Sequence, residues 1–178
     1  MTKKIIFSTG GTGGHIFPAI NLMKHFSDNG YEVLLITDAR GENFIKNYSR
    51  FRSYVLKAGT PTNKNFFKGL LSYLVIFYSI IKSIVILKKE KPDLIFGFGG
   101  YVSFPISFAS NFFNLPLVIY ENNLVLGRTN KYLLPFSKKI LLAKPITKNF
   151  PEKYKSKICQ VGSILDKNII NYSISKKK

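Results

Sequence analysis

Short apolar segments alternate with longer segments of helical periodicity along most of this chain. Residues 5–7 and 117–119 are continuously apolar, which is typical of strands in a sheet that is covered on both faces. The alternation implies parallel strand pairing through right-handed crossovers, and therefore an α/β fold with a doubly wound parallel sheet. The pattern predicts seven strands, at residues 4–9, 32–38, 53–57, 93–97, 117–121, 139–143 and 157–161. It predicts helices at residues 15–29, 66–89, 103–113 and 127–134.

Ligands of such sheets bind at the carboxyl ends of the strands, so the loops that follow the strands form the candidate site. The first loop, residues 9–15 (TGGTGGH), places four glycines within five residues before a predicted helix. Glycine lets the backbone approach a ligand closely, and the free N–H groups at a helix start attract phosphate. Ile16 stands where the dinucleotide-binding fingerprint needs its third glycine, and no Gly-Lys-Ser/Thr follows as in a P-loop. A tight turn without a ligand is the alternative, and the number of glycines argues against it.

Two further strands end in unusual loops. Residues 97–103 (GFGGYVS) repeat the glycine pattern, with Ser103 as a candidate helix cap. Two glycine loops at one edge of a sheet are stronger evidence for a ligand than either loop alone. Residues 121–123 (ENN), followed by residues 127–130 (GRTN), place short polar side chains at the end of a buried strand. For this third loop a plain turn is an equal alternative.

Together the three loops resemble the MurG family of glycosyltransferases. Residues 10–18 (GGTGGHIFP) are similar to the family's first glycine loop, and residues 97–105 (GFGGYVSFP) are similar to its second. Residues 121–130 (ENNLVLGRTN) are similar to the segment after its fifth strand. The resemblance runs from about residue 3 to residue 162, which is nearly the whole chain.

This resemblance implies a Rossmann-like domain at residues 1–165, the N-terminal, acceptor-binding half of a two-domain GT-B fold. Residues 166–178 would be a basic tail where the linker to an absent C-terminal donor domain begins. The implied activity is an inverting transfer of N-acetylglucosamine from UDP-N-acetylglucosamine to undecaprenyl-diphospho-muramoyl-pentapeptide. This step converts lipid I to lipid II in peptidoglycan synthesis. Neither a metal ion nor another cofactor is expected.

The matching positions imply roles for individual residues. Thr12, Gly13 and Gly14 would lie beside the donor diphosphate and the acceptor. Asn123 would contact the donor or align the acceptor. Four residues of the second loop would hold the acceptor diphosphate: Gly99, Gly100, Tyr101 and Ser103.

An inverting transfer also needs a base that takes the proton of the attacking hydroxyl. His15 is the first candidate, because imidazole as a class titrates near neutral pH. Its alternative role is structural, as a side chain that packs or caps at the start of a helix. Glu121 is the second candidate.

Several positions depart from the family's pattern. Tyr120 and Asn122 stand where the family usually has His and Gln. Phe104 replaces a Gly, which would crowd the acceptor loop, and Asp166 replaces an Arg that would face the donor. Twelve residues follow Asp166, too few for a second domain.

The most apolar segment is residues 69–87, in which Lys82 is the single charge. Its length nearly suffices for a bilayer core of about 30 Å. Spanning is rejected, because the helix lies between strands of one sheet and would place them on opposite sides of the membrane. A wholly buried helix and an interfacial helix are the alternatives. Ser72, Ser79 and Ser83 form one narrow stripe that leaves two apolar flanks, and the interfacial position is favoured.

Basic residues flank this segment on both sides, which suits an anionic membrane surface. The MurG family also docks on the membrane through an apolar patch ringed by basic residues. The expected membrane contacts are Phe66, Phe67, Leu70, Leu74, Phe77, Lys64, Lys68, Lys88 and Lys89. The protein is therefore expected at the cytoplasmic face of the bacterial inner membrane as a peripheral protein.

The composition narrows the partners. The 178 residues include 27 Lys and Arg against 9 Asp and Glu, a net charge of +18 that favours polyanions. No nucleic-acid-binding module is recognisable, so nucleic acid is not an expected partner. Cys159 is the single cysteine, which fits a reducing compartment without disulfides. Two separated histidines and few acids make no metal-ligand cluster.

Three hypotheses for the function follow. The first is a glycosyltransferase half that acts with a separate donor-binding domain or derives from a longer enzyme. The second is a non-catalytic remnant, or a module that binds the lipid precursor without transferring a sugar. The third is a nucleotide-cofactor oxidoreductase in which Asp38 binds a ribose, and the absent third glycine argues against it.

Overall fold

A single seven-stranded sheet organises the protein. The computed structural model describes residues 2–46, 51–59, 66–145 and 150–166. All strand pairs in the sheet are parallel, and the strand order is β3-β2-β1-β4-β5-β6-β7. The strands are β1 (Lys4–Ser8), β2 (Glu32–Thr37), β3 (Arg52–Val55), β4 (Leu94–Gly97), β5 (Leu117–Glu121), β6 (Lys139–Leu142) and β7 (Ile158–Gln160). The predicted α/β class and all seven predicted strands are confirmed.

In the described part of the chain, five α-helices and three short 3-10 helices accompany the strands. The α-helices are α1 (Gly13–Asp28), α2 (Ala39–Ile45), α3 (Phe66–Glu90), α4 (Ser103–Ala109) and α5 (Arg128–Leu133). The 3-10 helices are η1 (Ser110–Phe113), η2 (Leu134–Phe136) and η3 (Glu152–Lys157). The sequence pattern did not predict α2 or η3, because each is too short to display helical periodicity.

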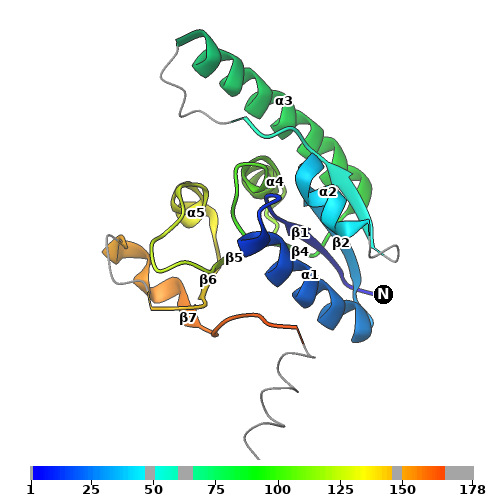
Figure 1. Ribbon diagram of the computed structural model, residues 1–178, viewed down its shortest axis with the longest axis vertical. Helices are drawn as coiled ribbons and strands as arrows, with labels where there is room; N and C mark the ends of the chain where they lie inside the picture. Colours follow the sequence, from blue (N-terminus) through cyan, green and yellow to red (C-terminus); the bar gives the residue numbers. More distant parts are fainter. Residues whose placement is uncertain (1, 47–50, 60–65, 146–149, 167–178) are drawn as a thin grey trace, which may run out of the picture.

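The helices cover both faces of the sheet, with α1 on one side and α3, α4 and α5 on the other (Figure 1). Side chains of β1 alternate between the two layers. Phe7 belongs to the core that α1 covers, and Ile6 belongs to the core beneath α3 and α4. Both side chains have no exposed surface, so the doubly wound arrangement leaves neither face of β1 to solvent.

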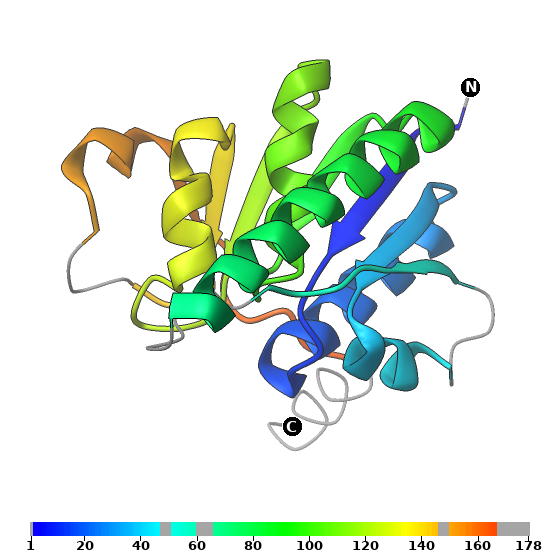
Figure 2. The ribbon, with the colours of Figure 1, turned by 90° about the horizontal axis from the view of Figure 1, so that it is seen from above.

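The chain changes direction within the sheet at β1. From β1 it moves outward through β2 to β3, and α3 then carries it back across the sheet to β4, on the other side of β1 (Figure 2). In an open parallel sheet, the crevice at such a switch point is where ligands bind. The carboxyl ends of β1 and β4 therefore define the candidate site.

The serine stripe of α3 faces the protein. The Ser79 hydroxyl donates a 2.9 Å hydrogen bond to the carbonyl of Lys57, and both Ser79 and Ser83 are fully buried. The opposite flank is exposed, with Leu71 at 62% and Phe77 at 64%. A wholly buried α3 is therefore excluded.

The length and composition of α3 meet the criteria for a membrane-spanning helix, and in the described part of the chain no other helix does. However, α3 leads from β3 to β4 within one sheet. If α3 spanned a membrane, these two strands would lie on opposite sides of it. Its first half projects beyond the sheet (Figure 1). This half carries Leu70 and Leu74, two of the expected membrane contacts, and both are exposed. Lys64 and the side chains of Phe66, Phe67 and Lys68 lie outside the described residues.

An ionic cluster closes the amino-terminal edge of the sheet, away from the candidate site. The buried carboxylate of Glu90, at the end of α3, pairs with Lys4 at 3.0 Å and Arg52 at 3.1 Å. It also accepts a 2.8 Å hydrogen bond from the hydroxyl of Tyr54. Burial alone would raise the pKa of Glu90, but these partners outweigh it and lower the pKa to about 2.

Candidate functional site

Two glycine loops meet at the switch point between β1 and β4. The amide of Gly10 donates a 2.9 Å hydrogen bond to the carbonyl of Gly99. Gly99 and Gly100 have φ angles of +90° and +81°, which residues with a side chain rarely adopt. A Cβ atom on Gly100 would lie only 2.7 Å from the Cα of Gly10. The glycines of the second loop are therefore required for the contact with the first.

The first loop leads directly into the N-terminus of α1. Thr12 is the N-cap residue in extended conformation, and within the described residues its side chain makes no capping hydrogen bond. The first turn contains no acidic residue, and Thr12 and Gly14 are exposed. The positive end of a 16-residue helix is thus open toward the outside of the protein, and an anion site there stays a prediction.

His15, the third residue of α1, packs against the second loop. A Cβ on Gly99 would lie 3.3 Å from the Cε1 of His15, so the ring rests on the glycine backbone. The Nδ1 of His15 and the Oδ1 of Asn130 are both shielded from solvent, and neither has a hydrogen-bond partner within the described residues. Buried polar atoms are normally paired, so these two unpaired atoms mark a candidate point of contact with a ligand.

A cleft of about 190 Å³ lies beside these atoms. Its walls come from α1, both ends of the third loop and the second glycine loop: His15, Gly99, Gly100, Tyr101, Glu121, Gly127, Arg128, Thr129 and Asn130. Arg128 is exposed, and among the described residues it has no carboxylate partner. The cleft therefore combines glycine backbone, an imidazole and a guanidinium, a set suited to a phosphorylated ligand.

Glu121 organises the third loop. Its Oε1 accepts hydrogen bonds from the backbone and side-chain amides of Asn123, at 3.0 and 2.9 Å. Its Oε2 accepts from the Gly127 amide at 2.8 Å and from the Asn130 side chain at 2.9 Å. Four donors occupy a carboxylate that has no exposed surface. This geometry favours a positioning role for Glu121 over the role of the base, for which it was the second candidate.

The asparagines of the third loop have different partners. Asn123 is exposed and directs its amide to Glu121, whereas the Asn122 side chain donates a 3.3 Å hydrogen bond to the carbonyl of Gly14. The third loop is thus joined to the start of α1. Since its polar side chains are tied to Glu121 and to the start of α1, the loop is more than a plain turn.

Ser103 does not cap α4, contrary to the prediction. The N-cap residue is Val102, and Ser103 is the first residue of the helix. Its buried hydroxyl donates a 2.9 Å hydrogen bond to the carbonyl of Gly100. The side chain therefore fixes the second loop from inside the protein, while Tyr101 is half-buried and lines the cleft.

Asp38 has a structural role that the sequence pattern did not predict. Its Oδ1 accepts a 2.9 Å hydrogen bond from the amide of Gly41 and caps α2, and its Oδ2 pairs with Arg40 at 3.0 Å. Burial raises the pKa of Asp38, but the hydrogen bonds from Gly41 and Arg40 outweigh it and hold the pKa below its usual value. A carboxylate engaged in this way is not free to bind a ribose, which removes the main support for an oxidoreductase.

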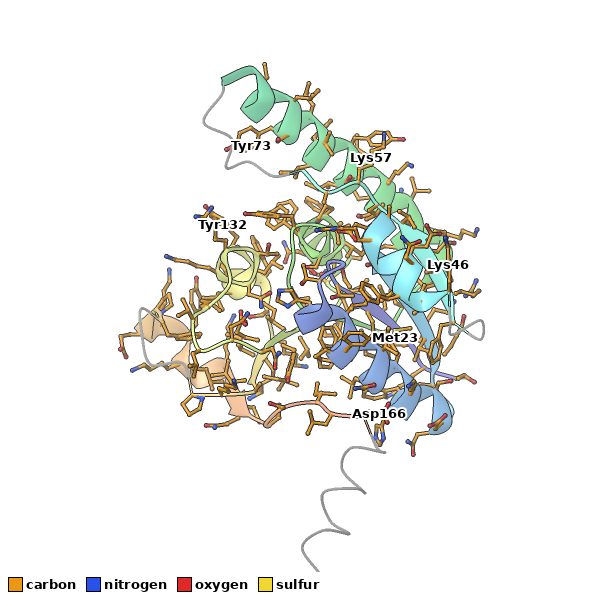
Figure 3. All side chains as sticks on the ribbon, viewed as in Figure 1. Met23, Lys46, Lys57, Tyr73, Tyr132 and Asp166 are labelled. Carbon is orange, nitrogen blue, oxygen red and sulfur yellow. The ribbon has the colours of Figure 1, made fainter. Side chains whose placement is uncertain are left out.

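Contacts with Tyr120 and with Lys24 help to hold the last described segment against the sheet and α1. The Tyr120 hydroxyl accepts a hydrogen bond from the amide of Ile164 at 3.1 Å, and burial raises the pKa of this hydroxyl. Asp166 pairs with Lys24 of α1 at 3.2 Å, and Figure 3 shows Asp166 close to that helix. Both residues were noted as departures from the family pattern, and here they join the end of the segment to the domain.

A larger cavity of about 470 Å³ adjoins the cleft. It lies between the first half of α3, the second loop with the start of α4, and α5. Its lining residues are Gly59, Tyr73, Ile76, Tyr101, Phe104, Arg128, Thr129 and Tyr132. Sequence reasoning did not assign site roles to Arg128, Thr129 or Tyr132. For Arg128 and Thr129, the position directly after Gly127, in the GRTN segment, was the available signal, whereas Tyr132 lies outside that segment.

Comparison with known proteins places these features in a wider context. Residues 5–142 match the glycosyltransferase family 28 N-terminal domain. The chain is 37% identical over 171 residues to the UDP-N-acetylglucosamine–N-acetylmuramyl-(pentapeptide) pyrophosphoryl-undecaprenol N-acetylglucosamine transferase of Pelagibacter ubique. It is 40% identical over 169 residues to the transferase of the same name from Rickettsia felis. These alignments cover 96% and 95% of the chain but 47% and 46% of the relatives, so the chain spans about half their length.

The solved structures agree with the sequence relatives. The crystal structure of Acinetobacter baumannii MurG superimposes with a TM-score of 0.76 and 27% sequence identity. The superposition covers 93% of this chain and 47% of that one. The predicted fold, a Rossmann-like sheet of the kind found in GT-B enzymes, and the predicted resemblance to the MurG family are both confirmed.

Proposed function

Because the chain belongs to glycosyltransferase family 28, whose N-terminal domain it matches, we propose that it is the acceptor-binding half of an N-acetylglucosaminyltransferase. The acceptor is undecaprenyl-diphospho-muramoyl-pentapeptide, the donor is UDP-N-acetylglucosamine, and the product is lipid II of peptidoglycan synthesis. The named activity of the Pelagibacter and Rickettsia relatives supports this choice of substrates. A donor-binding domain, on a separate chain or in a longer protein, completes the enzyme.

One observation carries the proposal: the two glycine loops touch at the switch point and leave an open helix N-terminus beside a cleft. Gly13 and Gly14 offer backbone amides at the positive end of α1, and Arg128 adds a guanidinium at the wall of the cleft. A diphosphate requires several such donors close together, without a side chain that keeps it at a distance. The acceptor diphosphate binds here, along Gly99, Gly100 and Tyr101.

His15 is the base in this mechanism. The 4-hydroxyl oxygen of the muramoyl sugar attacks the anomeric carbon of N-acetylglucosamine while the bond from that carbon to UDP breaks. The hydroxyl proton passes to the imidazole of His15, and attack opposite the leaving group inverts the anomeric configuration. The position of His15 supports this role, because it lines the cleft from the helix turn that follows the first glycine loop. Thr12 and Asn123 are exposed on the first and third loops, where they align the substrates.

The outer flank of α3 holds the protein on the membrane. Its exposed apolar side chains, including Leu74 at 58% and Phe77 at 64%, suit a helix that lies in the membrane interface. Lys88 and Lys89 are also exposed, but they lie near the other end of the helix, about 27 Å along its axis from Leu70. If α3 lies parallel to the membrane, its whole outer flank contacts the surface. The apolar side chains and the two lysines then both reach an anionic cytoplasmic leaflet.

A transfer assay tests the proposal. The purified chain is mixed with UDP-N-acetylglucosamine and a short-chain lipid I analogue, with and without a C-terminal donor domain from a related enzyme. Transfer that requires the added domain supports an acceptor-binding half. Binding of the analogue without transfer in either mixture would instead favour a module that binds the lipid precursor and is not catalytic. A folded chain that neither transfers nor binds contradicts both.

A further inference from the structure

The larger cavity differs in chemistry from the cleft that it adjoins. Its walls are mainly aromatic and aliphatic, with Tyr73 and Ile76 from α3, Tyr101 and Phe104 from the second loop and α4, and Tyr132 from α5. Its volume of about 470 Å³ falls within the range of roughly 300–1,000 Å³ that is typical of small-molecule sites. Such walls are suited to bind hydrocarbon.

The cavity and the cleft share three lining residues, Tyr101, Arg128 and Thr129. A ligand can therefore pass from one to the other without leaving the protein surface. The molecule that fits both has an anionic group for Arg128 and the glycine backbone, and an apolar chain attached directly to that group. A sugar nucleotide does not have this structure, whereas a prenyl diphosphate does.

We propose that this cavity binds the first isoprenyl units of a polyprenyl diphosphate whose diphosphate lies in the cleft. The inference rests on the proposed function, because it takes the cleft as the diphosphate site. The inner side of α3 contacts the prenyl chain through Ile76, and the outer side, through Phe77, faces the membrane. Figure 3 shows Tyr73 on α3 and Tyr132 on α5 at the same side of the molecule. Both are largely exposed, at 60% and 69%, and form the rim through which the chain leaves toward the bilayer.

This arrangement gives the protein a way to recognise the lipid as well as its headgroup. Membrane docking alone concentrates the protein near any lipid and does not distinguish one hydrocarbon chain from another. A cavity of fixed shape adds affinity for each isoprenyl unit that it buries, until it is full. The dependence of affinity on prenyl chain length, measured in the absence of a membrane, therefore distinguishes recognition by the cavity from membrane docking.

The test measures binding of methyl, geranyl and farnesyl diphosphate to the full 178-residue chain by calorimetry, without detergent and below micelle-forming concentrations. Affinity is expected to increase by about tenfold or more from methyl to farnesyl diphosphate. Ile76→Trp fills the cavity, so it should abolish that increase and leave the affinity for methyl diphosphate unchanged. Phe77→Trp is the matched control, because it places the same side chain on the exposed flank of the same helix. It should preserve the increase.

Tyr132→Ser provides a second variant in case Ile76→Trp does not fold, since the exposed Tyr132 contributes little to the core. It should reduce the gain from chain length by about threefold or more. The proposed cavity is overturned if the increase in affinity with chain length persists in both Ile76→Trp and Tyr132→Ser. It is also overturned if Phe77→Trp removes this increase as fully as Ile76→Trp does. The absence of any gain in the wild-type chain when methyl diphosphate binds overturns it too, and in that case the proposed function stands. If methyl diphosphate does not bind, farnesol replaces it as the probe. Farnesol binding that Ile76→Trp abolishes would support the cavity and contradict the diphosphate cleft. No binding of farnesol would overturn both the cavity and the cleft.

Discussion

The amide of Gly10 donates a 2.9 Å hydrogen bond to the carbonyl of Gly99, which joins two loops that are almost ninety residues apart in the chain. The adjacent Gly100 lies so close to Gly10 that neither has room for a side chain. This backbone contact brings the N-terminus of α1, His15 and the second loop together around one cleft. The geometry of the site therefore depends on a contact between backbones.

The first prediction concerns this contact. Gly100→Ala should destabilise the protein by about 2 kcal/mol, because alanine is strained at a φ of +81° and its Cβ would meet Gly10. Displacement of the two loops should also weaken binding of a diphosphate by about tenfold or more. Urea unfolding and calorimetry measure the two effects. Gly69→Ala is the control, since a Cβ there meets no atom of the described residues within 4 Å and alanine favours a helix. An equal loss of stability in both variants would contradict the explanation.

The second prediction distinguishes the two roles considered for Glu121. Glu121→Gln places an NH₂ group against donors that now face a carboxylate oxygen, so the free energy of unfolding should fall by about 2–4 kcal/mol. Glu152→Gln alters an exposed carboxylate and should change stability by less than about 0.5 kcal/mol. Urea denaturation provides the measurement. Full stability together with lost transfer would identify Glu121 as a base instead.

The third prediction concerns His15 as the base. His15→Ala should lower kcat of transfer by about 10²- to 10⁴-fold in the presence of the donor domain, with little change in acceptor affinity. Added imidazole should restore part of the activity, which a purely structural role would not explain. His25→Ala is the control, because His25 is exposed near the other end of α1. Unchanged kcat in His15→Ala would assign the proton to another group.

The fourth prediction is a pH dependence of stability. The pKa of Glu90 is lowered from 4.5 to about 2, so the folded state binds this proton less tightly than the unfolded state does. Its contribution should be complete above about pH 4.5 and should be lost as the pH falls toward 2. Glu90→Gln should cost about 2 kcal/mol at pH 7 and should flatten the dependence of the unfolding free energy within that window. Denaturant curves between pH 2 and 7 test this, and a wild-type curve that is already flat would contradict it.

The fifth prediction concerns the membrane. Phe77→Glu should reduce binding to vesicles that contain anionic phospholipid by about tenfold or more, because it removes a large apolar side chain from the outer flank of α3. Val161→Glu, at an exposed position after β7 on the far edge of the sheet, introduces the same charge and should have a much smaller effect. Vesicle sedimentation measures both. Equal losses would indicate a general effect of charge.

The pattern of the chain was sufficient to predict the sheet. The near-continuous apolar runs at β1 and β5 specified buried parallel strands, and the glycines between β1 and α1 specified a loop that approaches a ligand. These features are local, because strand periodicity and glycine conformation depend on a few neighbouring residues. The resemblance of the loops to the MurG family, which the relatives confirm, depended on the same local segments.

The sequence by itself thus determined the strands, their parallel connection and the loops at the site. Only the tertiary structure decided which flank of α3 is exposed, that Ser103 supports the second loop from inside, and that four donors surround Glu121. It also placed Ile76, Tyr101 and Tyr132 around one cavity, although they belong to three separate parts of the chain. A sequence pattern records the spacing of residues along the backbone, whereas a cavity or a hydrogen-bond set depends on how distant elements pack and on where each side chain finds a partner.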